Sequence, residues 1–248
     1  MKQFRIFSFK VIVLSFALFS HYTKAQDIES TNKKLSAKEK SIITIASLTA
    51  KGDLATLKLE LNKGLEAGLT VNEIKEILIH TYAYCGFPRS IRGLQTFMEV
   101  LNERKTKGIN DESGKEASPI KEDGNKYQRG KTILEQLTKT PQPNTLTGYS
   151  AFAPVIDTFL KEHLFTDIFE RDILTYTQRE LVTISVISAI GDAEPMLKSH
   201  LTISLNVGIS PEQLKEFIGV IQPIIGRKKT KEAKEVVSEV LKSRQKNN

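Results

Sequence analysis

The chain contains the same stretch of sequence twice, and this repetition constrains its fold more than any other feature. Residues 44–53 (TIASLTAKGD) resemble residues 183–192 (TISVISAIGD), 139 positions later. After a one-residue shift the correspondence continues at an offset of 140, and it pairs Gly86 with Gly226. Two copies of one unit predict a duplicated domain. Positions that agree between the copies are expected to serve the architecture, whereas positions that differ are candidates for a site that one copy retained.

Helix-start signals recur in register in the two copies and predict an all-α fold. The sequences SAKE (residues 36–39) and TYTQ (175–178) fit the capping box, in which two side chains satisfy unpaired backbone N–H groups at the start of a helix. A second pair, TVNE (70–73) and SPEQ (210–213), follows a glycine in each copy. Each copy is therefore expected to form two helices joined by a glycine turn, followed by a third helix. The sequence shows no sustained two-residue alternation, so no strand is predicted.

Residues 1–25 have the features of a secretory signal peptide. Basic residues border an apolar run at residues 11–19, and small residues precede a cleavage site after Ala25. Export to the periplasm or secretion is therefore predicted. The segment carries four cations and no acid, so its removal lowers the formal net charge from +7 to +3 and leaves little reason to expect a nucleic-acid partner. No segment is apolar for ~18 residues, which predicts no membrane span.

The remaining chain divides into two predicted domains and a connection. The first domain covers residues 26–104, the linker covers residues 105–149, and the second domain covers residues 150–248. The first part of the linker is polar, charged and rich in glycine, which is typical of a flexible linker or a loose surface loop. Residues 153–169 have the apolar spacing of an amphipathic helix that leads into the second copy.

Three chemically reactive side chains are spaced to share one face of a helix in the first copy. Glu76, His80 and Tyr84 lie at positions i, i+4 and i+8. A carboxylate one turn away from an imidazole can orient it, which is how a general base is built. An ordinary surface Glu–His pair beside a half-buried tyrosine would show the same spacing.

The two copies retain different chemical groups. The second copy keeps His200, Arg179 and Glu216, whereas the first has Glu60 at the position of His200. Apolar residues of the second copy replace the histidine and tyrosine named above. This complementary loss predicts one composite or single surviving site. Drift in two structural halves would produce the same pattern.

Cys85 is the only cysteine, so the chain cannot form an internal disulfide or a C-x-x-C pair. It lies on the apolar stripe of its helix, where a buried core residue with a raised pKa is expected. Arg89 and Arg92 follow it closely, and their positive charge is the argument for a reactive thiol instead. The sequence contains no metal-ligand spacing and no phosphate-binding glycine loop, so no metal or cofactor is predicted.

Three stretches carry a resemblance to a known family: residues 68–88 (GLTVNEIKEILIHTYAYCGFP), 174–192 (LTYTQRELVTISVISAIGD) and 197–216 (LKSHLTISLNVGISPEQLKE). The first fits the signature G-[VLI]-T-x-x-E-[IL]-x-E-[VIL]-[LI]-x-H-x-x-x-Y-x-G-x-P. Together they resemble the carboxymuconolactone decarboxylase family of the alkylhydroperoxidase D-like superfamily. The resemblance covers most of the chain after the signal peptide, with the exception of the linker.

The resemblance implies an all-α fold of alkylhydroperoxidase D-like helical domains, and oligomers that are commonly hexamers of single domains. It also implies one of two chemistries. One is decarboxylation of a carboxylated muconolactone by proton shuttling, and the other is peroxide reduction through a C-x-x-C pair with a nearby Glu and His. The chain lacks the cysteine pair and divides the decarboxylase-like residues between its copies.

The first hypothesis is an exported, cofactor-free decarboxylase-like enzyme that acts on a small carboxylated lactone or a related carbon acid by proton transfer. His80 or His200 would move the proton, and Glu76 would orient His80. Arg179 would bind the substrate carboxylate, with Arg92 as a second substrate-binding candidate. The residues predicted to complete the catalytic set are Tyr84 and Glu216.

Two alternatives remain open at this point. One is a peroxidase in which Cys85 is the nucleophile and His80 is the base. The other is a non-catalytic binding module. Because each chain holds two family domains, a homotrimer is predicted as the counterpart of a six-domain ring.

Overall fold

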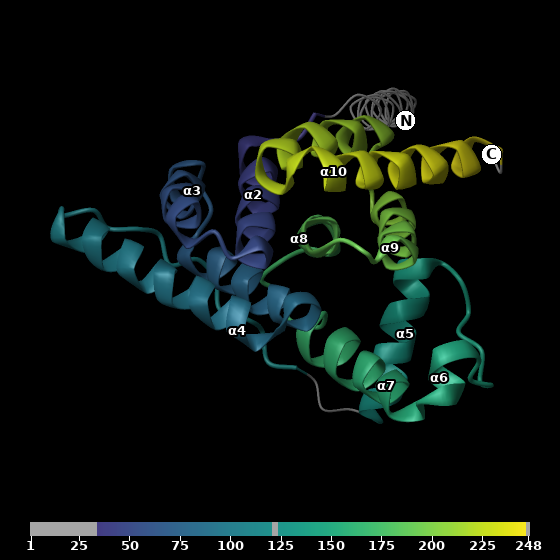
Figure 1. Cartoon of the computed structure of the whole chain (residues 1–248). Coiled ribbons are helices and arrows are strands. Elements are labelled where there is room, and N and C mark those ends of the chain that lie inside the picture. The colour runs from purple at the N-terminus through teal and green to yellow at the C-terminus, as the bar shows by residue number, and fades with distance from the viewer. Residues whose placement is uncertain (1–33, 121–123, 247–248) are drawn as a thin grey trace, which may run out of the picture. The chain divides into compact units, whose positions relative to one another are not determined.

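The computed structural model describes residues 34–120 and 124–246, and these residues form helices and connecting segments without a strand (Figure 1). This confirms the predicted all-α fold. None of the described helices combines the length and apolarity that a membrane span requires. The predicted signal peptide lies outside the described residues.

The predicted duplication appears as two matching sets of three helices. The first set is α2 (Ala37–Lys51), α3 (Leu54–Glu66) and α4 (Val71–Thr106). The second set is α8 (Tyr176–Ile190), α9 (Glu194–Asn206) and α10 (Pro211–Lys246). Corresponding helices have the same lengths of 15, 13 and 36 residues. Their bounds therefore reproduce the offsets of 139 and 140 seen in the sequence.

The predicted capping boxes form at the start of four helices. Ser36, Thr70 and Thr175 each accept a hydrogen bond from the backbone N–H three residues later, and the side chain of that residue bonds back to the cap. Ser210 and Gln213 make the same reciprocal pair at the start of α10. These bonds satisfy N–H groups that have no partner within the helix, which fixes where each helix begins.

A kink divides each long helix at a glycine. Gly86 in α4 has φ 81° and ψ 161°, and Gly226 in α10 has φ 81° and ψ 170°. Side chains with a Cβ rarely adopt this backbone conformation, which explains why glycine stands at both positions. The predicted third helix of each copy is thus the segment that follows the kink (Figure 1).

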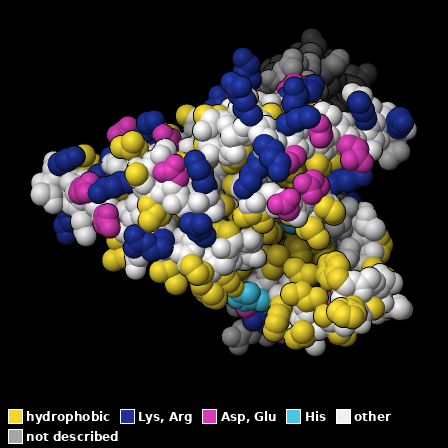
Figure 2. Space-filling view, viewed as in Figure 1, with side chains coloured by type: hydrophobic (Ala, Val, Ile, Leu, Met, Phe, Trp, Pro, Cys, Tyr) yellow, Lys and Arg dark blue, Asp and Glu magenta, His cyan; other side chains and the backbone are white. Residues whose placement is uncertain are grey.

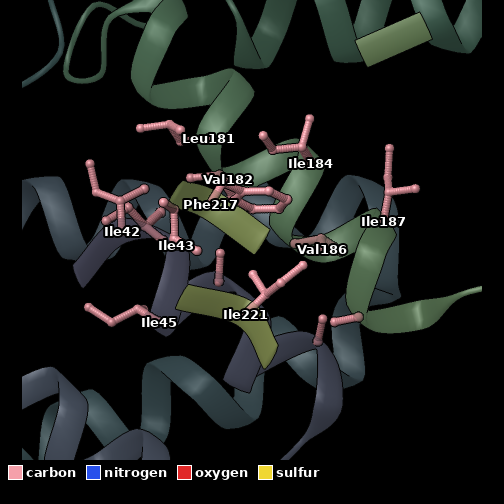
Figure 3. Close-up of a cluster of buried hydrophobic side chains, with 14 of the residues drawn as sticks. Ile42, Ile43, Ile45, Leu181, Val182, Ile184, Val186, Ile187, Phe217 and Ile221 are labelled. Atoms are coloured by element: carbon pink, nitrogen blue, oxygen red, sulfur yellow. The ribbon is translucent and has the colours of Figure 1, made fainter. Parts of the chain in front are cut away.

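The two copies share a single hydrophobic core. Helices α2 and α8 lie against each other, while α4 crosses to contact α8 and α10 crosses to contact α2. Figure 3 shows core side chains from three helices: Ile42, Ile43 and Ile45 of α2, Leu181, Val182, Ile184, Val186 and Ile187 of α8, and Phe217 and Ile221 of α10. Neither copy has a core of its own, and the chain from Leu35 onward forms one compact unit.

The segment after α4 is held in place by hydrogen bonds, contrary to the expectation of a loose loop. The backbone N–H groups of Val71 and Asn72 donate to the carbonyls of Glu112 and Ser113, both over 2.9 Å. Arg104 binds Asp111 through two nitrogens. Residues 112–116 therefore pack against the start of α4, because they supply partners for the unpaired N–H groups there and for the side chain of Asn72.

The rest of the connection forms a small helical layer: α5 (Lys126–Thr138), α6 (Gly148–Phe152), α7 (Pro154–Thr158) and the π-helical segment η1 (Phe159–Ile168). The amphipathic helix predicted at residues 153–169 is thus divided between α7 and η1. Helix α5 packs so closely on η1 that a Cβ at Gly130 would lie only 1.8 Å from the carbonyl oxygen of Lys161. This contact requires glycine at position 130.

Candidate active site at the junction of the two copies

The face of α4 that carries Glu76, His80 and Tyr84 is covered by the second copy. Glu76 and His80 have no exposed surface. Tyr84 packs against the core that the two copies share and against a second apolar cluster between α5, η1 and α9. The three side chains share one face, as their spacing predicts. That face lies against α8, so the group is not the ordinary surface pair that the spacing also allowed.

Two arginines bind the single carboxylate of Glu76. Arg179 of α8 donates from Nη2 to Oε1 of Glu76 over 2.8 Å. Arg171, just before α8, donates from Nε to both carboxylate oxygens over 3.1 and 3.0 Å. The hydrogen bonds to Glu76 raise the pKa of Arg171, whereas burial lowers the pKa of Arg179. Because Arg179 is fully buried and engaged here, it is not placed to bind a substrate carboxylate as the sequence suggested.

Arg179, and not Glu76, orients His80. Nη1 of Arg179 lies 3.1 Å from Nδ1 of His80, and a guanidinium can only donate, so Nδ1 accepts. Nε2 of His80 then carries the hydrogen and donates to Oγ1 of Thr183 over 2.9 Å, while the Thr183 hydroxyl donates to the carbonyl of Arg179. Burial, followed by the charges of Arg179 and His200, holds the pKa of His80 well below its usual value. His80 is therefore neutral with both nitrogens occupied, which does not suit the base predicted from the sequence.

His200 makes a second carboxylate–imidazole pair beside this cluster. Its Nδ1 lies 2.9 Å from Oε2 of Glu180, whose side chain is fully buried. The carboxylate accepts the Nδ1 hydrogen, so the lone pair of the neutral ring lies on Nε2. No described residue forms a hydrogen bond to Nε2, and the side chain is 13% exposed. His200 therefore combines a fixed orientation with a free, reachable nitrogen, which is the arrangement of a general base.

Tyr84 joins the two copies at this point. Its ring lies nearly perpendicular to that of His200 at a centroid distance of 5.7 Å, and the centroid of the His80 ring lies 5.5 Å away on the same helix. Burial and the charge of Glu180 raise the pKa of Tyr84, so its hydroxyl keeps its hydrogen. The hydroxyl of Tyr84 and Oε1 of Glu180 are buried, and neither has a partner at hydrogen-bond geometry among the described residues, although Thr183 lies near enough to Tyr84 to oppose the rise in its pKa. Buried polar atoms without partners mark positions that a water or a ligand can complete.

The side chains around Tyr84 and His200 are largely apolar. Figure 2 shows a hollow below α8 and α9 that is lined mainly by hydrophobic side chains. The cluster between α5, η1 and α9 includes the following buried residues: Ile133, Leu137, Leu164, Phe165, Ile168, Phe169 and Ile203. Tyr82, Tyr84 and Tyr176 pack against it. Such surroundings strengthen any hydrogen bond or charge interaction inside them.

Two predicted residues lie outside the cluster. Glu216 of α10 pairs with Lys40 of α2 over 2.7 Å. This pair is the counterpart, in the other half of the duplication, of the Glu76–Arg179 pair. Arg92 is exposed and donates to the side chain of Gln95 over 2.6 Å, so it is not part of the group around His200.

Cys85 is half-buried, and not fully buried as the sequence suggested. Its thiol donates to the backbone carbonyl of Thr81 over 3.1 Å. Burial raises the pKa of Cys85 to about 11, while the hydrogen bond to Thr81 and then the charge of Arg89 oppose this rise. A serine hydroxyl could make the same bond to Thr81, so Cys85→Ser should leave no unpaired buried hydroxyl.

Sequence reasoning missed Glu180, Arg171 and Thr183. Glu180 follows Arg179 directly and stands where the first copy has Ser41, so the comparison of copies contained a signal for it. The positions of Arg171 and Thr183 depend on the contact between α4 and α8, and no spacing within one helix reveals it. Over the described ranges, no three His, Cys, Asp or Glu side chains are placed to hold a metal ion.

Comparison with known proteins decides the family. The sequence matches the carboxymuconolactone decarboxylase family over residues 16–97 and 154–239. The chain belongs to this family. The two matches correspond to the two copies, and the first begins within the predicted signal peptide. An uncharacterized protein of Methanocaldococcus jannaschii is 28% identical to this carboxymuconolactone decarboxylase family member over 74 residues, which cover 30% of this chain and 69% of the relative.

Proposed function

We propose that this member of the carboxymuconolactone decarboxylase family is an exported enzyme that transfers protons at a small carboxylated lactone or a related carbon acid. The observation that carries the proposal is the His200–Glu180 pair, which leaves Nε2 of His200 free while the ring of His200 contacts the ring of Tyr84. His200 is the proton-transferring residue of this proposal, and Glu180 fixes its orientation. Tyr84 is the hydrogen-bond donor for the substrate.

The proposed reaction places charge where these groups can stabilise it. Loss of CO₂ breaks the bond between the lactone and its carboxyl carbon, and the electron pair passes into the ring as an enolate. The hydroxyl of Tyr84 donates to the enolate oxygen, because burial keeps its hydrogen in place. Protonated His200 then delivers a proton to carbon and regains one from solvent. The buried charge of Glu180 stabilises His200 while it is protonated.

The group around Glu76 acts as the support of this site. Arg179 binds Glu76 and His80 at once, and both lie one or two turns before Tyr84 on α4. These residues are positioning residues in this proposal, because the side chains of Glu76, His80 and Arg179 have no exposed surface through which a substrate could reach them. Their bonds fix α4 against α8, and with it the distance between Tyr84 and His200.

Parallel assays against carboxylactones and hydroperoxides test the proposal. The wild-type protein should release CO₂ from a carboxylactone, and Cys85→Ser should retain that activity. A thiol with a pKa of about 11 is ionised in roughly one molecule in 10⁴ at pH 7, so no peroxide reduction by Cys85 is expected. Peroxide reduction that disappears in Cys85→Ser would replace the proposal by the peroxidase alternative. Inactivity toward both substrate classes would favour the binding module.

We also propose that the exported chain assembles as a homotrimer. Exposed apolar side chains support burial against a partner: Tyr149, Phe152, Val155, Ile156 and Phe159 of α6, α7 and η1. Among these side chains Phe152 has the largest exposed fraction, 91%. Light scattering should give three times the chain mass, whereas a monodisperse monomer at micromolar concentration would refute the trimer.

Mass spectrometry of the exported protein should place the new N-terminus after Ala25.

A further inference from the structure

The duplication creates a second position equivalent to the candidate active site. It lies between α2, α3 and α10, where Val220 and Ile224 stand at the positions of His80 and Tyr84 in the other half. Glu60 stands at the position of His200. The structure has a pocket of about 300 Å³ at this place, and these three residues line it. That volume lies at the lower end of the range found for small-molecule sites.

This pocket lacks the groups that would carry out proton transfer. Ser41 replaces Glu180, so a counterpart of the carboxylate–imidazole pair cannot form. The ion pair below the pocket is also weaker. Lys40 and Glu216 are 44% and 27% exposed, whereas the side chains of Arg179 and Glu76 are fully buried. The pocket therefore has room for a small molecule but no group placed for proton transfer, which leaves binding as the function to consider.

The lining of the pocket indicates what it could bind. Part of its wall is apolar, with the buried side chain of Leu48 beside Pro223, Val220 and Ile224. Its charged residues are one cation and two carboxylates, because Lys51, Asp53 and Glu60 line it. Lys51 and Asp53 pair with each other over 3.4 Å, which leaves Glu60 as the excess negative charge. The residue paired with Glu60 is Lys63, a side chain that is 66% exposed and can move aside.

We propose that this second pocket binds a small molecule with an apolar body and a single cationic group, without converting it. The apolar part of the ligand lies against Leu48, Val220 and Ile224, and its cation replaces Lys63 at Glu60. Burial of the apolar part removes it from water, and the charge-assisted hydrogen bond to Glu60 selects an ammonium group. The pocket is thus a binding site derived from a second catalytic site.

Calorimetric titration of the wild-type protein with benzylammonium tests this proposal, with benzyl alcohol as the neutral analogue. Benzylammonium should bind saturably, and benzyl alcohol should bind about tenfold more weakly or worse because it lacks the charge. Glu60→Gln should remove this preference. Thr56→Trp changes an exposed residue at the rim of the pocket, and it should block binding without loss of fold.

The duplication supplies a matched control. Met196 occupies the position in α9 that Thr56 occupies in α3, and it is 52% exposed. Met196→Trp should leave benzylammonium binding unchanged. Binding that is lost in Met196→Trp and retained in Thr56→Trp would place the ligand in the other half and overturn the proposal. The same conclusion would follow from an absence of saturable binding at millimolar concentration, or from binding that neither Thr56→Trp nor Glu60→Gln weakens.

Discussion

At the scale of single residues, two histidines in one cluster have opposite environments. His80 lies between Arg179 and Thr183, so both of its nitrogens are occupied, and it has no exposed surface. His200 has one nitrogen fixed by Glu180 and the other free. The first environment suits a neutral, structural imidazole, and the second leaves one ring nitrogen free for a substrate.

The environment of His80 predicts how the stability of the protein depends on pH. Its pKa is about 6.5 in the unfolded chain and well below that in the folded protein, so the unfolded state binds more protons as the pH falls below 6.5. The free energy of unfolding should therefore fall on acidification by up to about 1.4 kcal/mol per pH unit from this residue, and the contribution should be fully present above pH 6.5. Urea titrations between pH 5 and 8 give the free energy of unfolding at each pH for the wild type and His80→Gln. This free energy should change less steeply with pH in the variant. Equal slopes would contradict the buried, neutral state.

The sequence predicted part of this site. Helical spacing placed Glu76, His80 and Tyr84 on one face, and the structure confirms it. Spacing could not reveal what covers that face, because Arg179 is 103 residues away from Glu76. The partner of His80 was therefore wrong, and the Glu180–His200 pair was missed since its members lie on two helices.

At the scale of elements, local signals sufficed for the repeated helices and failed for the connection. Capping residues determine where α2, α4 and α8 begin, and these bonds involve neighbours in the chain. The π-helical turns of η1 depend on other contacts. The hydroxyl of Thr166 bonds to the carbonyl of Lys161, five residues earlier, and Gly130 of α5 packs against that same carbonyl. A periodic apolar pattern contains no information about such a contact.

The kinks in α4 and α10 allow a comparison of matched variants. Gly86→Ala and Gly226→Ala should each lower the free energy of unfolding by about 1–3 kcal/mol, because both glycines have φ 81°. Backbone strain is the expected cause, since a Cβ at Gly86 would meet only Pro88, at 3.6 Å, and a Cβ at Gly226 would meet nothing within 4 Å. Chemical unfolding measures both values.

Activity should separate the two glycine variants. Gly86 lies two residues after Tyr84, so strain there should also lower turnover, whereas Gly226→Ala should leave turnover close to that of the wild type. A loss of stability in only one variant would contradict the equivalence of the two kinks.

At the scale of the whole folded unit, each copy completes the other. Helix α4 of the first copy packs on α8 of the second, and α10 of the second packs on α2 of the first. The two crossings carry the ion pairs Glu76–Arg179 and Lys40–Glu216. One crossing contains the buried polar cluster, and the other is open to solvent beside the second pocket.

The two ion pairs should differ in what they contribute to stability. Arg179→Met leaves the buried carboxylate of Glu76 with Arg171 alone, and it should lower the free energy of unfolding by about 3–5 kcal/mol. Lys40→Met removes a partly exposed partner and should cost about 0–1 kcal/mol. Guanidinium titrations of both variants make the comparison. Equal costs would contradict the asymmetry between the two crossings.

Turnover of a carboxylactone by His200→Gln and His80→Gln is the most direct measurement of which histidine moves the proton. His200→Gln removes the free nitrogen and should lower kcat by about 100-fold or more. His80→Gln removes a positioning residue, so it should lose far less activity than His200→Gln. Circular dichroism gives the folded fraction of each variant, and kcat is compared per folded molecule. A loss of activity in His80→Gln that equals or exceeds the loss in His200→Gln would contradict the assignment of His200 as the proton-transferring residue.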